Sequence, residues 1–171
     1  MNTRDLTAVL PTLMSELVNG APDPHVSTYM LNRGDAGLLG SLDRLSAAAA
    51  SAPSAGGASI AAHADHLRYG LSLLNRWAAG EPAPWQGADW TKSWKTTTVT
   101  DAEWSELRQA LGRETRSWID ALRTPREVET EEMRWITSSI AHLAYHLGAI
   151  RQIDRATRGP SAEDERPYQT A

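Results

Sequence analysis

The apolar residues of this chain recur at intervals of three and four residues in five separate segments. The clearest segment covers residues 131–158, and its apolar positions are Ile136, Ile140, Leu143, Leu147, Ile150 and Ile153. This spacing places them on one face of a helix. Val, Ile, Thr and Tyr do not alternate with polar residues over any long stretch, and Phe is absent. The pattern therefore predicts an all-α protein without a convincing strand.

The first three predicted helices cover residues 4–19, a segment that begins near Asp35, and residues 59–79. In the first, Pro11 either moves the start or kinks the helix. The second gives way to a linker of small residues over 47–58. In the third, Ser59 is the predicted N-cap, and Gly80 with Pro82 ends the helix.

The fourth predicted helix has the clearest start. Thr100 followed by Glu103 forms a capping box, and Val99 and Trp104 stand where a hydrophobic staple would close. Pro125 stops this helix, and Gly159-Pro160 ends the fifth, which covers 131–158. The segment 81–98 between the third and fourth helices is interpreted as an irregular loop.

The length of 171 residues fits one domain with its own core. We expect a single helical domain over 1–160 and a polar C-terminal tail over 161–171. The second to fifth helices are predicted to form a four-helix bundle, with the first as an additional N-terminal helix packed across the outside or one end. Short connections favour antiparallel packing of neighbouring helices.

Composition and charge exclude several classes of function. Cysteine is absent, so disulfides, thiolate metal ligands and a cysteine nucleophile are excluded, and any metal must be bound by nitrogen and oxygen. The net charge of -4 gives no basic surface for nucleic acid. No apolar run approaches the roughly 18 residues that span a membrane. The N-terminal residues carry no secretory signal pattern, so a cytoplasmic location is expected.

Four of the five histidines form two tight groups. His63 and His66 lie three residues apart in the third predicted helix, and His142 and His146 lie four apart in the fifth. Such spacing puts each pair on one helix face, one turn apart. Both pairs border the apolar stripes, and imidazole suits Zn, Ni, Fe or Cu. Spacing alone leaves an alternative open, in which these are core histidines with ordinary hydrogen bonds.

The segment His142-Leu-Ala-Tyr-His146-Leu-Gly-Ala-Ile150 resembles the last-helix motif of the DinB-like, or YfiT-type, superfamily of metal-dependent hydrolases. The segment from Ser59 to Leu67 is similar to the earlier helix that supplies the first ligand in that superfamily. The resemblance is clearest over residues 59–155. Where many relatives carry Arg directly after the last histidine, this chain has Leu147.

The resemblance implies a four-helix bundle that binds a divalent transition metal, commonly Zn or Ni, through His66, His142 and His146. His63 is the rival ligand, and otherwise a second-shell donor or a pocket residue. The implied function is a metal-dependent enzyme acting on a small molecule, of the thiol S-transferase or hydrolase type. The substrate would include a low-molecular-weight thiol, and relatives are often homodimers. The alternative is a non-catalytic metal-binding or stress-response bundle. Asp65 and Tyr145 are not favoured as a general base.

Five tryptophans crowd the segment 77–104; they are Trp77, Trp85, Trp90, Trp94 and Trp104. One interpretation is an aromatic lid or pocket wall beside the metal. The favoured interpretation is a satellite core under a long loop, because aromatic clusters usually pack. Arg68 and Arg76 are candidates for binding a carboxylate of an acidic thiol, although arginines on a helix more often form a solvated edge.

Overall fold

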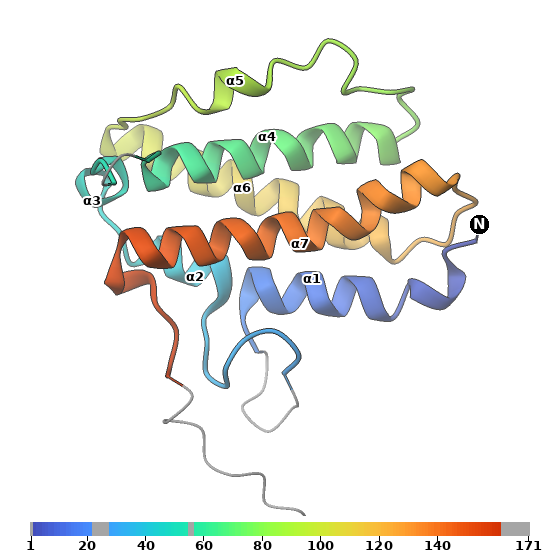
Figure 1. The fold of residues 1–171 in the computed structure, drawn as a ribbon, viewed down its shortest axis with the longest axis horizontal. Helices are drawn as coiled ribbons and strands as arrows, with labels where there is room; N and C mark the ends of the chain where they lie inside the picture. Colours follow the sequence, from blue (N-terminus) through green and yellow to red (C-terminus); the bar gives the residue numbers. More distant parts are fainter. Residues whose placement is uncertain (1, 22–27, 55–56, 162–171) are drawn as a thin grey trace, which may run out of the picture.

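Four long helices pack lengthwise against one another (Figure 1). The structure is a computed structural model that describes residues 2–21, 28–54 and 57–161. Within these ranges the regular elements are helical, and extended pairing is limited to two isolated bridges. The long helices are α1 (Val9–Asn19), α4 (Ile60–Ala78), α6 (Asp101–Leu122) and α7 (Thr130–Ile153). The all-α prediction is confirmed for the described residues, while the predicted tail at 162–171 lies outside them.

The shorter elements connect the long helices. They are η1 (Arg4–Leu6), α2 (Gly37–Asp43), α3 (Ala47–Ser51), α5 (Trp90–Ser93) and η2 (Arg155–Thr157). Helix α3 lies inside the segment that was predicted to be a linker, so that prediction is wrong for 47–51. The physical reason is local: Ala has the highest helix propensity, and the Ser46 side chain accepts a hydrogen bond from the backbone N–H of Ala49.

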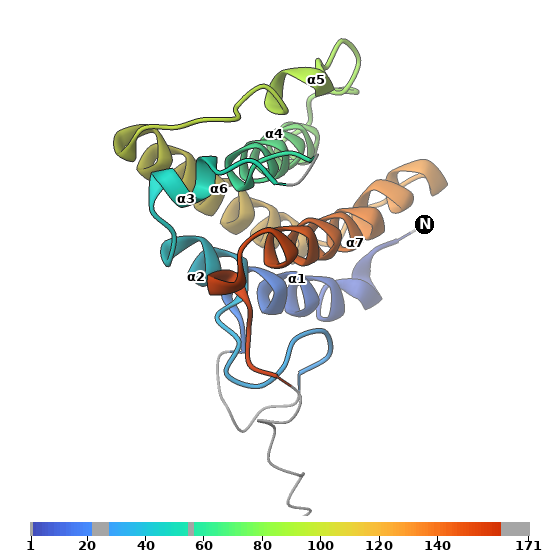
Figure 2. The same cartoon turned by 60° about the vertical axis from the view of Figure 1, so that its left-hand side comes forward.

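The first helix belongs to the packed core, and the prediction that it lies outside is wrong. Helix α1 contacts both α6 and α7, and α4 contacts the same two helices (Figure 2). Met14, Leu17 and Val18 of α1 are completely or almost completely buried. Pro11 is the third residue of α1, where its missing N–H costs no helical hydrogen bond, and the chain before Val9 forms η1 instead.

Helices α4 and α6 run in the same direction, which the prediction of antiparallel neighbours did not anticipate. The chain leaves the end of α4, returns along the outside of this helix through α5, and only then begins α6 (Figure 1). The connection is long because it must cover the length of α4 a second time. This returning segment, residues 79–100, carries Trp85, Trp90 and Trp94. Trp90 and Trp94 lie against His66 of α4, and Trp85 lies against Trp135 of α7.

The two ends of α4 and the start of α6 follow the predicted signals, whereas the end of α7 does not. Ser59 accepts from the N–H of Ala62 at the start of α4, and Gly80, with φ of 99°, follows its last turn. At the start of α6, Thr100 and Glu103 form the reciprocal capping box. Helix α7 ends earlier than predicted, because Asp154 adopts extended dihedral angles and its carboxylate accepts from Ala156 N–H to start η2.

The apolar stripe of α7 faces the interior as predicted. Its buried members are Ile136, Ile140, Leu143, Leu147 and Ile150. Burial of each such side chain stabilises the fold by about 1.5–3 kcal/mol relative to exposure. No helix in the described part of the chain is both long enough and apolar enough to cross a membrane.

Candidate metal centre

The two histidine pairs meet where α4 and α7 pack against each other. His63 and His66 on α4 and His146 on α7 are buried, while His142 is half-buried. Each pair lies on the interior edge of its helix, as the amphipathic pattern predicted. The structure therefore brings all four side chains to one place, including the three that the sequence predicted as ligands.

Three ring nitrogens converge on one point. The Nε2 atom of His142 lies 2.9 Å from Nε2 of His146 and 3.3 Å from Nε2 of His66. One ring nitrogen from each of these three residues lies within 4.8 Å of the other two. Among the described residues, this is the one group of His, Asp and Glu side chains with the geometry of a metal site.

Ser93 orients the ring of His66. Its Oγ lies 3.2 Å from Nδ1 of His66 and 3.3 Å from the carbonyl oxygen of Trp90. When the single hydroxyl hydrogen is donated to that carbonyl, Oγ accepts from Nδ1–H of His66. This tautomer leaves the lone pair of His66 on Nε2, which faces the convergence point. Ser93 was not predicted as a site residue, because nothing in the pattern of a short loop helix marks a contact with α4.

His63 contacts the opposite side of the His146 ring. Its Nδ1 lies 2.8 Å from Nδ1 of His146, whereas the atom of His146 that faces His142 is Nε2. With the proton of His146 on Nδ1, this ring donates to His63 and keeps its Nε2 lone pair free. In this geometry His63 fixes the orientation of His146, as outer hydrogen-bond partners do for metal-binding histidines.

Burial lowers the pKa of all four imidazoles. The pKa of His146 falls to about 3 and that of His66 to about 4, from burial first and from the neighbouring imidazoles second. Burial also lowers the pKa of His63 and of His142. The rings are therefore neutral near pH 7, which is the form of imidazole that binds metals.

The donor set fits a divalent transition metal. Nitrogens about 2.0–2.1 Å from a zinc ion lie about 3.3 Å apart in a tetrahedral arrangement and about 2.9 Å apart at right angles. The observed separations of 3.3 and 2.9 Å match these two values. With Nδ1 of His66 and His146 engaged elsewhere, the Nε2 lone pairs of these two rings both face Nε2 of His142 and are available to a cation. Three nitrogen ligands also leave a coordination position open.

Two tryptophans of the returning segment cover the cluster. The Trp94 ring stacks on His66 with centroids 4.3 Å apart and planes at 26°, and it meets the edge of His63 at 5.3 Å. The Trp90 ring lies 6.0 Å from His66. The favoured interpretation of a separate satellite core is therefore wrong for Trp90 and Trp94. It is wrong for Trp104 as well, because this residue belongs to the main hydrophobic core, where it is buried and donates to the carbonyl oxygen of Leu45.

Asp65 lies between the two histidines of α4 and joins this helix to the returning segment. Asp65 accepts hydrogen bonds from Arg68 at 2.7 Å and from the hydroxyl of Thr96 at 2.7 Å. Both carboxylate oxygens of Asp65 are therefore engaged by partners other than the histidine rings. Arg68 is engaged with Asp65, and Arg76 pairs with Glu81, which matches the solvated-edge interpretation of these arginines. Tyr145 is 69% exposed.

Comparisons of the chain with protein-family models, with curated proteins and with solved structures gave no match.

Proposed function

We propose that this protein is a metal-dependent enzyme of the DinB-like type that acts on a small molecule by thiol transfer or hydrolysis. The single observation that carries the proposal is the convergence of the Nε2 atoms of His66, His142 and His146. The packing of four long helices and the two histidine pairs on α4 and α7 are compatible with a DinB-type bundle. We assign a divalent transition metal to the three nitrogens, with Zn or Ni as the first candidates.

The side chains around the cluster have distinct tasks in this proposal. A bound divalent metal supplies Lewis acidity at the coordination position that three imidazoles leave open. Ser93 and His63 hold the rings of His66 and His146 in the tautomers that keep Nε2 unprotonated. Trp94 covers one face of His66 and excludes water from that side.

The adjoining cavity favours an enzyme over a protein that only stores metal. A cavity of about 310 Å³ lies beside the cluster and includes His142 in its wall. Storage requires no such space, whereas a substrate must approach the open coordination position. We therefore place the substrate next to His142.

Elemental analysis of protein purified without a polyhistidine tag tests the metal assignment. We expect one equivalent of metal per chain, retained through gel filtration and lost in His146→Ala. Activity is then assayed with a low-molecular-weight thiol and an electrophilic acceptor, and separately with hydrolysable esters and amides. Protein that takes up no Zn or Ni after dialysis against either ion contradicts the proposal, and stoichiometric metal without turnover of either kind supports the non-catalytic alternative.

A further inference from the structure

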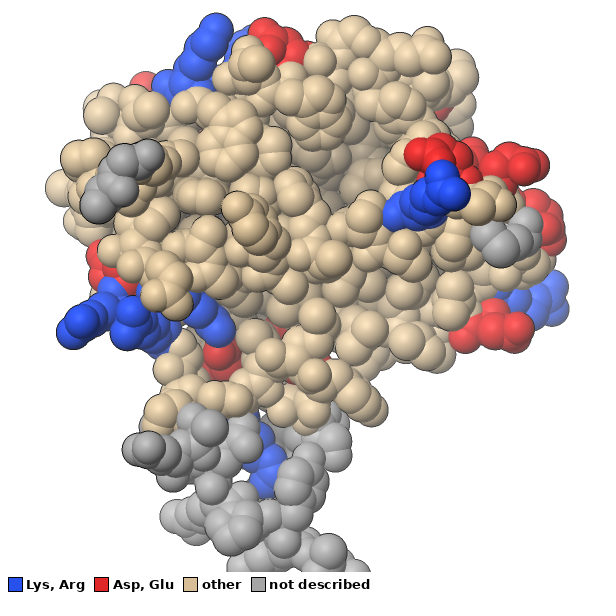
Figure 3. Space-filling model, viewed as in Figure 1, with Lys and Arg blue, Asp and Glu red and all other residues tan. Residues whose placement is uncertain are grey.

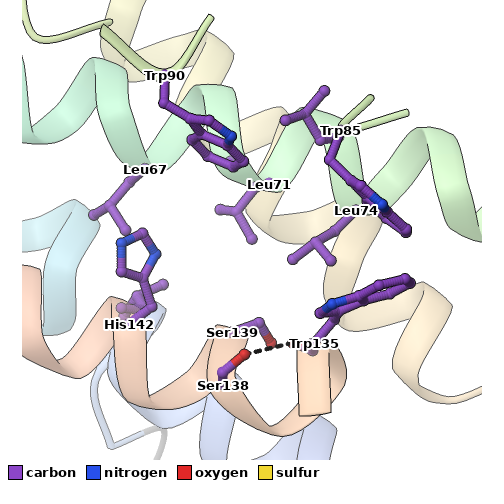
Figure 4. A pocket seen from close by; sticks show the side chains of 12 residues that line it. Leu67, Leu71, Leu74, Trp85, Trp90, Trp135, Ser138, Ser139 and His142 are labelled. Carbon is purple, nitrogen blue, oxygen red and sulfur yellow. Dashed lines mark hydrogen bonds between the residues drawn. The ribbon is translucent and has the colours of Figure 1, made fainter. Parts of the chain in front are cut away.

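The cavity beside the histidine cluster lies between α4 and α7, under the returning segment (Figure 4). Its main walls are aliphatic and aromatic side chains from these three parts of the chain; they are Leu67, Leu71, Leu74, Trp85, Trp90 and Trp135. On the face in Figure 3 the surface is hollowed between α4 and α7, and residues other than Lys, Arg, Asp and Glu form most of its surroundings.

None of the residues that line the cavity carries a charged side chain, and the hydroxyl groups of its two serines already make hydrogen bonds within the chain. Ser139 accepts from the indole N–H of Trp118 at 2.9 Å and donates to the carbonyl oxygen of Ile136. Ser138 lies 3.3 Å from the carbonyl oxygen of Trp135. A carboxylate placed here would lose its hydration without meeting a cationic side chain, so the cavity selects against charged groups.

The size of the cavity limits what it can hold. Its volume of about 310 Å³ is about twice that of the roughly 150 Å³ apolar cavity that binds benzene. One or two rings therefore fit. The indole rings of Trp85 and Trp135 meet at a centroid distance of 3.7 Å and close one end of the space. Flat walls of this kind favour a flat apolar group.

His142 joins the cavity to the metal centre. It is a lining residue of the cavity, and its Nε2 is one of the three converging nitrogens. A molecule whose apolar body occupies the cavity thus presents its other end to the coordination point. We infer that the substrate is an uncharged small molecule with an aromatic or branched apolar body of up to two rings and one polar group at the end that meets His142. This inference deepens the proposed function and rests on it for the metal.

Substitution of Gly70 by a larger residue tests this inference. It lies inside α4, where glycine costs helix stability relative to alanine, and it lines the cavity. A Cβ atom added there would meet only Trp90, at an ordinary 3.7 Å. Gly70→Leu should therefore fill the cavity without a backbone clash. Gly148 on α7 is the matched control, since a Cβ atom added there meets nothing within 4 Å.

The first experiment measures binding of indole to the metal-free full-length protein by calorimetry. We expect one equivalent of indole to bind the parent and Gly148→Leu with affinities within twofold of each other. Gly70→Leu should weaken binding at least tenfold. A second cavity-filling variant, Ser138→Phe, is compared with Thr137→Phe on the same helix, in case Gly70→Leu does not fold. The inference is overturned if the parent binds no indole. It is also overturned if folded Gly70→Leu or Ser138→Phe binds indole with the same affinity as the parent.

The second experiment uses zinc-loaded protein and two thiols that differ in one group, phenylmethanethiol and 4-(mercaptomethyl)benzoate. We expect the uncharged thiol to bind at least tenfold more tightly than the carboxylate, and zinc to strengthen its binding relative to metal-free protein. Equal or tighter binding of the carboxylate overturns the inference. If no zinc binds at all, the proposed function fails, while the indole experiment still decides whether the cavity accepts apolar rings.

Discussion

Glu16 on α1 and His146 on α7 are both buried, with exposed fractions of 6% and 2%, yet their hydrogen-bond partners differ in kind. The Glu16 carboxylate accepts from the backbone N–H groups of three consecutive residues, Tyr29, Met30 and Leu31. Every one of these contacts joins a donor to an acceptor. Such a group orders the chain that follows α1 and leaves nothing for a ligand to satisfy.

The Nε2 atom of His146 has no such complement. It faces Nε2 of His142, which in turn faces Nε2 of His66. When Nδ1 of His66 and of His146 carries the proton, the three Nε2 atoms share at most the one hydrogen of His142. The difference teaches that burial of a polar group does not by itself mark a functional site. The distinguishing property is whether the local partners balance the charge and hydrogen-bonding capacity of the group. Glu16 is balanced within the chain, whereas in the proposed function a cation from outside the chain would balance the histidine cluster.

The largest effect that tests this contrast is expected for His146→Ala. Removal of one of three nitrogen ligands should weaken metal affinity by at least about a thousandfold, or about 4 kcal/mol, while helix content stays intact. Isothermal titration with Zn²⁺ measures the change, and circular dichroism checks the fold. Thr137→Ala, at an exposed position of the same helix, serves as the control and should keep stoichiometric binding. Parent-like affinity in His146→Ala would refute the ligand assignment.

Glu16→Ala should affect stability and spare the metal centre. Loss of the carboxylate leaves three backbone N–H groups without their acceptor, at a cost of about 3 kcal/mol in the free energy of unfolding. Glu16→Gln keeps one carbonyl oxygen and should cost less. Urea denaturation of metal-free protein measures both variants. A change in zinc affinity larger than twofold in Glu16→Gln would show that the two buried groups are not independent.

The metal-free protein should lose stability as the pH falls below 6.5. The unfolded chain takes up protons on its histidines near the ordinary pKa of 6.5, whereas folding lowers the pKa of His66 to about 4 and that of His146 to about 3. Stability is therefore greatest above pH 6.5 and declines toward pH 4, by on the order of 2 kcal/mol between pH 7 and 5. Urea midpoints measured across this range provide the test. His146→Leu should reduce the slope of the unfolding free energy against pH. An unchanged slope in that variant would contradict the prediction.

The smallest predicted effect concerns His63. His63→Ala removes the acceptor for Nδ1–H of His146 and should weaken metal affinity about tenfold, equivalent to about 1.4 kcal/mol. His63→Gln retains an acceptor oxygen and should recover most of this loss. Competition with a chromophoric chelator resolves differences of this size. Complete loss of metal binding in His63→Ala would instead identify His63 as a direct ligand.

The sequence predicted those features that depend on residues close together in the chain. The capping box of Thr100 and Glu103, the Ser59 cap and the stripe of α7 all follow from local spacing, and each appears in the structure. The pairing of His142 with His146 also needs only one turn of helix. That His66 joins them, in place of His63, was implied only by the resemblance of residues 59–67 to the first-ligand helix of the DinB-like superfamily.

Features that depend on the path of the chain through space were not predictable in the same way. An amphipathic stripe shows that α1 packs against something, but it does not identify α6 and α7 as its neighbours. The contacts of Trp94 and Ser93 with His66 arise because the segment after α4 turns back along this helix. Such a segment has no helical periodicity. The sequence therefore showed that its tryptophans are crowded together, but not which helix they contact.

The shared position of His142 has a thermodynamic consequence. His142 lines the cavity, and its Nε2 is one of the three converging nitrogens. Occupancy of the cavity and occupancy of the nitrogen triad are therefore coupled equilibria, and linkage requires the coupling to be reciprocal. Whatever factor the metal contributes to the affinity for an apolar molecule, that molecule contributes the same factor to retention of the metal. A protein of this design would hold its ion most firmly while a substrate is present.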